Sequence, residues 1–238
     1  MANTRYVTAN RLTEESKAIQ AKGRNLVLIL GLPVAVAAFF IHPLVGLVAL
    51  AGVAALYGSI GGSAVIEAGA RGEDAALDWL SKLPDSFAIF NQVDLPSEQS
   101  RTGMVETDLV VTGPEAVFVI EVKHNNGAID CDESRSQWTV SKTGRRGNRY
   151  GKEMRNPIRQ VKKQVWLLSE YLKSRKAKRW IQPIVLFTHP DVSLGRSSDL
   201  SVPVLTGPEV VEYIRNFKPE RPRPVKENTV QAIATLKG

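Results

Sequence analysis

Three residues near the middle of the chain have the types and spacing that phosphodiester chemistry requires: Asp108, Glu121 and Lys123. Glu121 and Lys123 stand two residues apart at the end of an apolar run, so on a strand they point to the same side. If the run that contains Asp108 pairs with this strand as a hairpin, Asp108 and Glu121 can converge on one cation. Two carboxylates with a carbonyl and waters are usual ligands of Mg²⁺ in phosphate chemistry. Lys123 would then lie beside the attacking water. The alternative is a salt bridge that only caps the strand ends.

The distribution of charge favours a polyanionic partner. The 238 residues carry a net charge of +7, but residues 73–133 hold three basic and thirteen acidic residues. Residues 134–182 hold fifteen basic and two acidic residues. Carboxylates can gather a metal ion while lysines and arginines hold phosphates, so this order suits a metal-dependent enzyme that acts on nucleic acid. The alternative is two oppositely charged surfaces that attract each other or are simply solvated.

Seven basic residues within the basic stretch are predicted to contact nucleic acid, DNA being favoured over RNA. They are Lys142, Arg145, Arg146, Arg149, Lys152, Arg155 and Arg159. The segment Lys142–Lys152 is expected to be a basic loop that touches phosphates. A merely exposed loop is the alternative.

The elements that must position these residues follow from hydrophobic patterns. Ala116–Lys123 is a nearly continuous apolar run, which indicates a strand buried on both faces. Asn156-Pro157 is a good start for a helix, and apolar residues recur after it at spacings of three and four. Further helices are expected over Glu73–Leu80 and Pro208–Phe217, and further strands over Phe87–Val93, Thr107–Val111, Gln182–Phe187 and Pro203–Leu205. Alternating strands and helices indicate an α/β sheet.

Several of these pieces occur together in the order of a known family. They are Gly69-x-x-Gly72-Glu73, Thr107–Val111, Ile120–Lys123, Gly127, Trp138 and Asn156-Pro157-x-x-Gln160. Over about residues 67–172 the chain resembles the nuclease-related (NERD) domain, which belongs with the PD-(D/E)XK nuclease-like superfamily.

The resemblance implies a restriction-endonuclease-like mixed sheet flanked by helices. It also implies that Asp108, Glu121 and the Val122 carbonyl bind Mg²⁺, with Mn²⁺ as an alternative ion, and that Lys123 is the catalytic lysine. Glu73 matches an assisting acid on a helix, and Gln160 matches a helix glutamine near the site.

A long apolar segment precedes this domain. Leu26–Ile60 contains 35 residues without one Asp, Glu, Lys or Arg, and His42-Pro43 divides it. One continuous helix would be about 52 Å long, too long for a hydrocarbon core of about 30 Å. A transmembrane helical hairpin is therefore expected, with basic residues before it holding both ends in the cytoplasm at the inner membrane. The alternatives are one span with an apolar surface segment, a re-entrant hairpin, or a buried core hairpin of a soluble protein.

These patterns divide the chain into five parts. They are a basic cytoplasmic leader (1–25), the membrane hairpin (26–60), a glycine-rich joint (61–72), the nuclease-like domain (73–217) and a Pro-rich, basic tail (218–238) that is expected to be loose from Lys218 to Lys226. The single Cys131 excludes a disulfide scaffold and a multi-cysteine zinc site. The predicted function is a membrane-anchored Mg²⁺-dependent nuclease. Two alternatives remain: a non-catalytic module that holds nucleic acid at the bilayer, and a membrane assembly or stress protein.

Overall fold

The computed structural model describes residues 1–61, 64–143, 147–196 and 199–237, and it contains two compact units. One unit is formed by Met1–Thr8 together with Arg71–Gly238, and the other by Ala9–Ala70. The first unit therefore consists of two separate stretches of the chain, with the apolar segment inserted between them.

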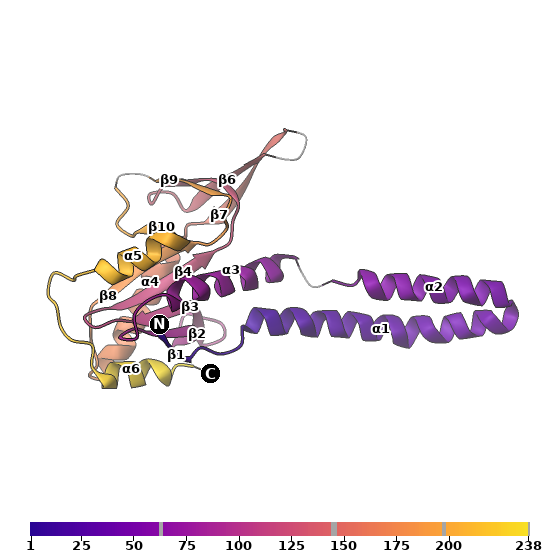
Figure 1. Ribbon diagram of the computed structural model, residues 1–238, viewed down its shortest axis with the longest axis horizontal. Coiled ribbons are helices and arrows are strands. Elements are labelled where there is room, and N and C mark those ends of the chain that lie inside the picture. The colour runs from indigo at the N-terminus through magenta and orange to yellow at the C-terminus, as the bar shows by residue number, and fades with distance from the viewer. Residues whose placement is uncertain (62–63, 144–146, 197–198, 238) are drawn as a thin grey trace. The chain divides into compact units, whose positions relative to one another are not determined.

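The unit Ala9–Ala70 is built on two long helices, α1 (Arg11–Ile41) and α2 (Pro43–Ser59), which run antiparallel (Figure 1). Asn10 begins α1, since its side chain accepts a hydrogen bond from the Leu12 N–H at 2.9 Å. His42 is extended between the helices, and Pro43 occupies the first position of α2. A Cβ atom at Gly46 would lie 2.4 Å from the Phe39 Cα atom, so only glycine allows this close approach.

The expected leader has a definite structure. Strand β1 (Asn3–Tyr6) pairs in parallel with β2 (Ala88–Pro96), and α1 already begins at Arg11. Residues 1–25 therefore contribute a strand to the main sheet and the first turns of α1. The Asn10 side-chain amide donates to the Ala70 carbonyl at 3.3 Å, so the two ends of the inserted unit lie next to each other.

The expected glycine-rich joint is largely helical. Helix α3 spans Ala64–Ser81 and so begins nine residues before the predicted Glu73. Gly72 lies inside α3, where a Cβ atom would come within 2.7 Å of the His124 Cβ atom. This glycine therefore serves close packing against the end of a strand rather than flexibility.

A mixed six-stranded sheet forms the centre of the first unit, in the order β1-β2-β3-β4-β8-β10. Its remaining strands are β3 (Met104–Thr112), β4 (Val117–Lys123), β8 (Ile181–Phe187) and β10 (Val204–Thr206). β2, β3 and β4 are antiparallel neighbours, whereas β4, β8 and β10 run parallel. β4 is buried from Val117 to Val122, as its apolar run predicted. The mixed α/β fold flanked by helices is confirmed.

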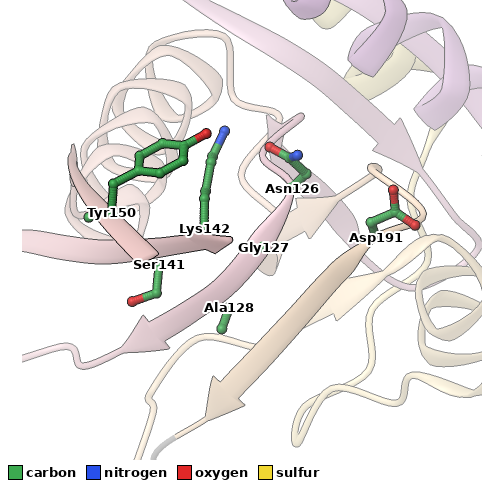
Figure 2. A pocket seen from close by; sticks show the side chains of 8 residues that line it. Asn126, Gly127, Ala128, Ser141, Lys142, Tyr150 and Asp191 are labelled. Atoms are coloured by element: carbon green, nitrogen blue, oxygen red, sulfur yellow. The ribbon is translucent and has the colours of Figure 1, made fainter. Parts of the chain in front are cut away.

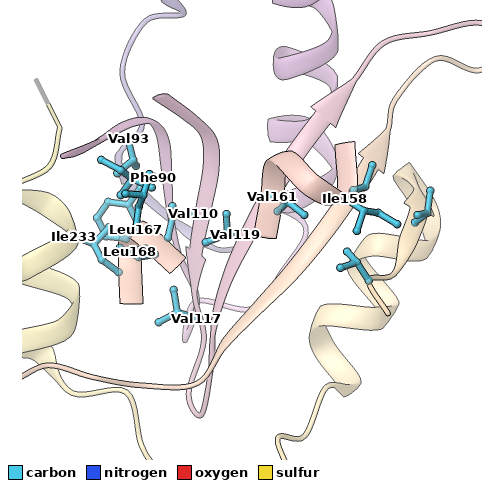
Figure 3. Close-up of a cluster of buried hydrophobic side chains, with 14 of the residues drawn as sticks. Phe90, Val93, Val110, Val117, Val119, Ile158, Val161, Leu167, Leu168 and Ile233 are labelled. Atoms are coloured by element: carbon cyan, nitrogen blue, oxygen red, sulfur yellow. The ribbon is translucent and has the colours of Figure 1, made fainter. Parts of the chain in front are cut away.

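Each face of this sheet carries its own hydrophobic core, because successive side chains on a strand point to opposite faces. Val110 and Val119 lie in a core with α4 (Pro157–Ser174), and Figure 3 shows this cluster. On the other face Val111 and Ile120 pack with residues of α3 and of α5 (Gly207–Asn216). The central strands are thus covered on both sides.

The C-terminal tail contains a helix after the stretch Lys218–Lys226 that was expected to be loose. Helix α6 (Glu227–Ala234) follows residues 218–226, and its Ile233 is fully buried in the core that contains α4. Tyr171 of α4 donates its hydroxyl proton to the Ala232 carbonyl at 3.2 Å. The tail therefore completes the packing of the domain.

A second, four-stranded sheet has the order β7-β6-β5-β9 and was not predicted. Its strands are β5 (Gly127–Cys131), β6 (Gln137–Thr143), β7 (Arg149–Arg155) and β9 (Val192–Arg196). The expected loop Lys142–Lys152 is in fact the end of the β6–β7 hairpin, and its residues 144–146 lie outside the described residues. Trp138 of β6 stacks on Phe187 of β8, with ring centroids 6.5 Å apart, so this sheet joins the main core.

Candidate functional site

The paired strands β3 and β4 bring the two predicted carboxylates together. Leu109 pairs with Ile120, and the same register continued by one residue places Asp108 opposite Glu121. Asp108 also accepts the Val122 N–H through Oδ2 at 2.7 Å, so its carboxylate is held against the end of β4. The hairpin arrangement expected from the sequence is therefore present at this level of the sheet.

Glu121 is the centre of the site. Its side chain is almost fully buried, and a buried charge needs partners to offset its desolvation. The Lys123 ammonium lies 2.5 Å from Oε1, and the Gln164 amide donates to Oε2 at 2.8 Å. Both carboxylate oxygens of Glu121 are thus oriented by neighbouring side chains.

Helix α4 supplies two glutamines to this site. Gln160 and Gln164 are one turn apart and therefore share a helix face. The Gln160 Oε1 atom lies 3.4 Å from the Lys123 Nζ atom, whereas Gln164 contacts Glu121 directly. The family resemblance suggested a role for Gln160. For Gln164 the sequence indicated only a position on a solvated helix face. Gln164 is in fact fully buried, and its Oε1 atom accepts no hydrogen bond from any residue that the structure describes.

Glu73 approaches the site from α3 and has a partner that sequence reasoning missed. Gln92 of β2 donates its side-chain amide to Glu73 Oε2 at 3.1 Å, and both side chains are buried. Gln92 has a φ of 52°, in the left-handed region that non-glycine residues rarely adopt. It lies in β2 between the positions that pair with Leu109 and Thr107 of β3, at the level of Asp108. Only this backbone conformation distinguishes it, and the sequence gives no sign of it.

The acids of the site repel one another. Burial, followed by the negative charge of Glu106, raises the pKa of Glu73 from 4.5 to about 7, although the bond from Gln92 opposes this. Burial and the Glu121 charge together raise the pKa of Asp108 well above its ordinary value. A cation between these carboxylates would relieve the repulsion.

The donor set fits Mg²⁺ better than a softer metal. Among the described residues no group of three or more His, Cys, Asp or Glu side chains is arranged to hold a metal ion. Asp108 and Glu121 provide two carboxylates, and Mg²⁺ is typically bound by one or two carboxylates with waters and substrate phosphates in the remaining positions. The contribution of the Val122 carbonyl stays a prediction.

The five predicted basic residues that the structure describes lie on β6, β7 and α4. Lys142, Tyr150 and Lys152 lie on one face of the β6–β7 hairpin, and Arg155 occupies a position on the other face. Arg159, at the start of α4, donates to the Ser134 carbonyl at 2.9 Å. Arg145 and Arg146 lie outside the described residues, and Arg149 lies in β7.

Two histidines also meet beside Lys123. The rings of His124 and His189 are 4.9 Å apart, and His124 Nδ1 lies 3.0 Å from the Thr188 hydroxyl. Burial, and then the neighbouring charge of His189, lowers the pKa of His124. The sequence spacing of these residues gave no indication that they would meet.

Comparison with known proteins gives one match. Residues 68–188 match the model of the nuclease-related domain (NERD) family. No curated protein and no solved structure matches the chain. The matched segment runs from α3 through β8 and includes Glu73, Asp108, Glu121, Lys123 and Gln160. β1, β10, α5 and α6 lie outside it, yet they complete the same unit.

Proposed function

Because this chain belongs to the nuclease-related domain family, we propose that it is a metal-dependent nuclease that hydrolyses phosphodiester bonds, with DNA as the favoured substrate. The observation that carries the proposal is the buried Glu121 carboxylate, which lies opposite Asp108 and is shared between Lys123 and Gln164. A second buried acid beside Glu121 is costly unless it is protonated or shares a bound cation, and a shared cation gives both acids a role. A salt bridge alone would explain Lys123 and Glu121 but not Asp108.

Each residue has a role in this proposal. Asp108 and Glu121 hold Mg²⁺, or Mn²⁺ in its place, and a bound ion of this kind polarises the phosphate and favours ionisation of water. Lys123 orients the attacking water and offsets negative charge that develops on the phosphate. Gln164 and Gln160 keep Glu121 and Lys123 in position, and Glu73 with Gln92 supports the opposite side of the site.

A cleavage assay on the full chain in detergent tests the proposal. Plasmid DNA, linear duplex, single-stranded DNA and RNA are incubated with Mg²⁺, with Mn²⁺ or with a chelator. Cleavage is expected only with a divalent ion, and Lys123→Ala should lower its rate about 100-fold or more, as loss of one charge-stabilising donor typically does. Lys173→Ala, an exposed lysine at the end of α4, is the matched control and should cleave normally. Binding without any cleavage would instead identify a non-catalytic nucleic-acid module.

The apolar unit anchors the nuclease in the cytoplasmic membrane in this proposal. α1 and a second apolar helical segment that begins at Pro43 are long and apolar enough to cross a bilayer. β1 precedes these helices and pairs with β2, which follows them. Paired strands must lie on the same side of a bilayer, so this pairing supports a hairpin over a single span. The basic residues before Leu26 favour the cytoplasmic side for both ends.

Site-specific labelling checks this topology. In a Cys131→Ser background, a cysteine at the exposed turn residue His42 should react from outside intact cells with an impermeant maleimide. A cysteine at the exposed Ser201 should react only after the membrane is opened. Epitopes added to the two termini should both be protected in intact cells. Termini found on opposite sides would rule out the hairpin.

A further inference from the structure

An open pocket of about 710 Å³ lies on the second sheet, where β5 leaves the end of β4. Its volume is in the range of roughly 300–1,000 Å³ that small-molecule sites occupy. Side chains of Tyr150, Lys142, Asn126 and Asp191 border it, and Figure 2 shows the first three rising from the same side of the ribbon. The pocket therefore combines an aromatic ring, a cation and hydrogen-bonding groups.

The strand register explains why these side chains face one opening. Lys142 of β6 pairs with Tyr150 of β7, and the β5–β6 register continued by one residue places Gly127 beside Lys142. Tyr150, Lys142 and Gly127 thus form one row across the sheet. A Cβ atom at Gly127 would lie 2.4 Å from the Ser141 carbonyl oxygen and 3.2 Å from the Lys142 Cγ atom, so glycine lets β5 approach β6 closely beside the lysine. The φ of 98° at Gly127 disfavours any other residue there.

The Tyr150 ring is available to a ligand. The residue is 55% exposed although it lies within a strand, and its neighbour along β7 is Gly151. An aromatic ring left exposed on a basic hairpin offers a flat apolar surface next to positive charge. Single-stranded nucleic acids bind in this way, since bases stack on aromatic rings while lysines and arginines follow the phosphates.

The pocket lies close to the candidate catalytic site. Asn126 is three residues beyond Lys123, so their Cα atoms are at most about 11 Å apart. The chain segments that follow β4 and β8 remain hydrogen-bonded to each other beyond the site. The Thr188 N–H donates to the Lys123 carbonyl at 3.0 Å, and the Gly127 N–H donates to the Asp191 carbonyl at 2.9 Å. A strand bound at Lys123 can therefore extend into the pocket.

The pocket also opens on the face of the second sheet that meets the main sheet. Trp138, Val140 and Lys142 alternate along β6 and so share a face, and Trp138 stacks on Phe187. Phe187 in turn pairs with Lys123 in the main sheet. Lys142 is about 13 Å along β6 from Trp138, at a rise of about 3.3 Å per residue.

From these observations we infer that the pocket receives an unpaired nucleobase of single-stranded nucleic acid, stacked on Tyr150 with its phosphate near Lys142. Asn126 and Asp191 would contact the edge of the base, which a duplex keeps occupied by pairing. The inference rests on the proposed function, because it assigns the substrate class of the same site. The preferred substrate is then single-stranded nucleic acid, or a duplex with an unpaired end.

Binding measurements without divalent ions test this inference separately from catalysis. Fluorescence anisotropy on the full chain in detergent compares a labelled thymidine homopolymer, a duplex, and a single strand with abasic positions. Tyr150→Ala should weaken binding of the homopolymer about 5- to 100-fold and leave duplex affinity unchanged, while Tyr150→Phe should stay within about twofold of wild type. Trp166→Ala removes an aromatic residue of similar exposure on α4 and is the matched control.

The abasic strand decides whether stacking is the cause. If Tyr150 stacks on a base, the difference between wild type and Tyr150→Ala should vanish on that strand, as a double-mutant cycle requires. A loss that persists on abasic DNA, that affects the duplex equally, or that does not occur at all would overturn the inference. Tyr150-dependent binding without any cleavage would leave the pocket assigned and overturn only the nuclease. Cleavage without Tyr150-dependent binding would support the nuclease and overturn the assignment of the pocket.

Discussion

Replacing Glu121 with Gln is expected to lower the rate of Mg²⁺-dependent cleavage by at least about 1,000-fold. Glutamine keeps the shape of the side chain but removes the negative charge that attracts a cation and pairs with Lys123. A thousandfold loss corresponds to about 4 kcal/mol of transition-state stabilisation, which is within what a bound metal ion contributes. The measurement is the initial rate of cleavage of single-stranded DNA at saturating Mg²⁺.

A thermal-shift experiment separates this effect from a folding defect. Lys123 and Gln164 favour the Glu121 charge, whereas burial and the neighbouring Asp108 oppose it, so removal of the charge should change the metal-free unfolding temperature little. Wild type should gain stability when Mg²⁺ is added, and Glu121→Gln should lose most of that gain. Glu115→Gln alters an exposed glutamate before the other end of β4 and should retain both properties. Normal cleavage by Glu121→Gln would remove the basis of the proposed site.

The catalytic strand could be predicted because its pattern is local. An apolar run such as Ala116–Lys123 indicates a buried strand by itself, and a carboxylate and a lysine at its end stand out against it. The place of Asp108 beside Glu121 could be predicted because two strands that follow each other in the sequence commonly pair as an antiparallel hairpin. The start of helix α4 could be predicted equally well, since Asn156 caps this helix by accepting the Ile158 N–H at 2.9 Å.

The missed features depend on contacts between distant parts of the chain. β1 and β2 are separated by the whole apolar unit, and nothing in residues 3–6 indicates that they reach the sheet edge. Gln164 is buried only because the end of β4 meets α4, and a glutamine on a helix otherwise belongs to a solvated face. The β6–β7 hairpin has polar, glycine-containing strand ends, which by composition resemble a loop. α6 is short, and tertiary packing rather than propensity stabilises such a helix.

The stability of the catalytic unit is expected to fall as the pH rises from about 4.5 to about 7 because of Glu73. Its pKa is about 7 in the folded protein, mainly because of burial and then because of the Glu106 charge, against 4.5 for an ordinary glutamate. Below pH 4.5 the carboxyl is protonated in both states, so burial costs it no charge. Between the two pKa values the folded chain holds a proton that the unfolded chain has released, so the free energy of unfolding declines with pH.

Glu73→Gln should abolish this decline, since its amide is neutral at every pH and can still pair with Gln92. Relative to wild type, the free energy of unfolding of the variant should increase by about 3 kcal/mol between pH 4.5 and pH 8. Urea titration in a chelator, followed by tryptophan fluorescence, measures this in the full chain. All four tryptophans belong to the unit that contains the site, so the signal reports its unfolding alone.

Glu209→Gln provides a control of the opposite sign. Burial alone would raise the pKa of Glu209, but hydrogen bonds from Thr206 and the Arg196 guanidinium outweigh it and lower this pKa. Glu209 therefore stabilises the folded protein when it is ionised, and this contribution is lost as the pH falls through its folded pKa. Its glutamine variant should lose stability relative to wild type as the pH rises from 3 to 7, whereas Glu73→Gln gains it between 4.5 and 8. If the free energy of unfolding of both variants changes with pH in the same direction, the cause is a general effect of removing negative charge. The buried carboxyl of Glu73 then does not control the stability of the site.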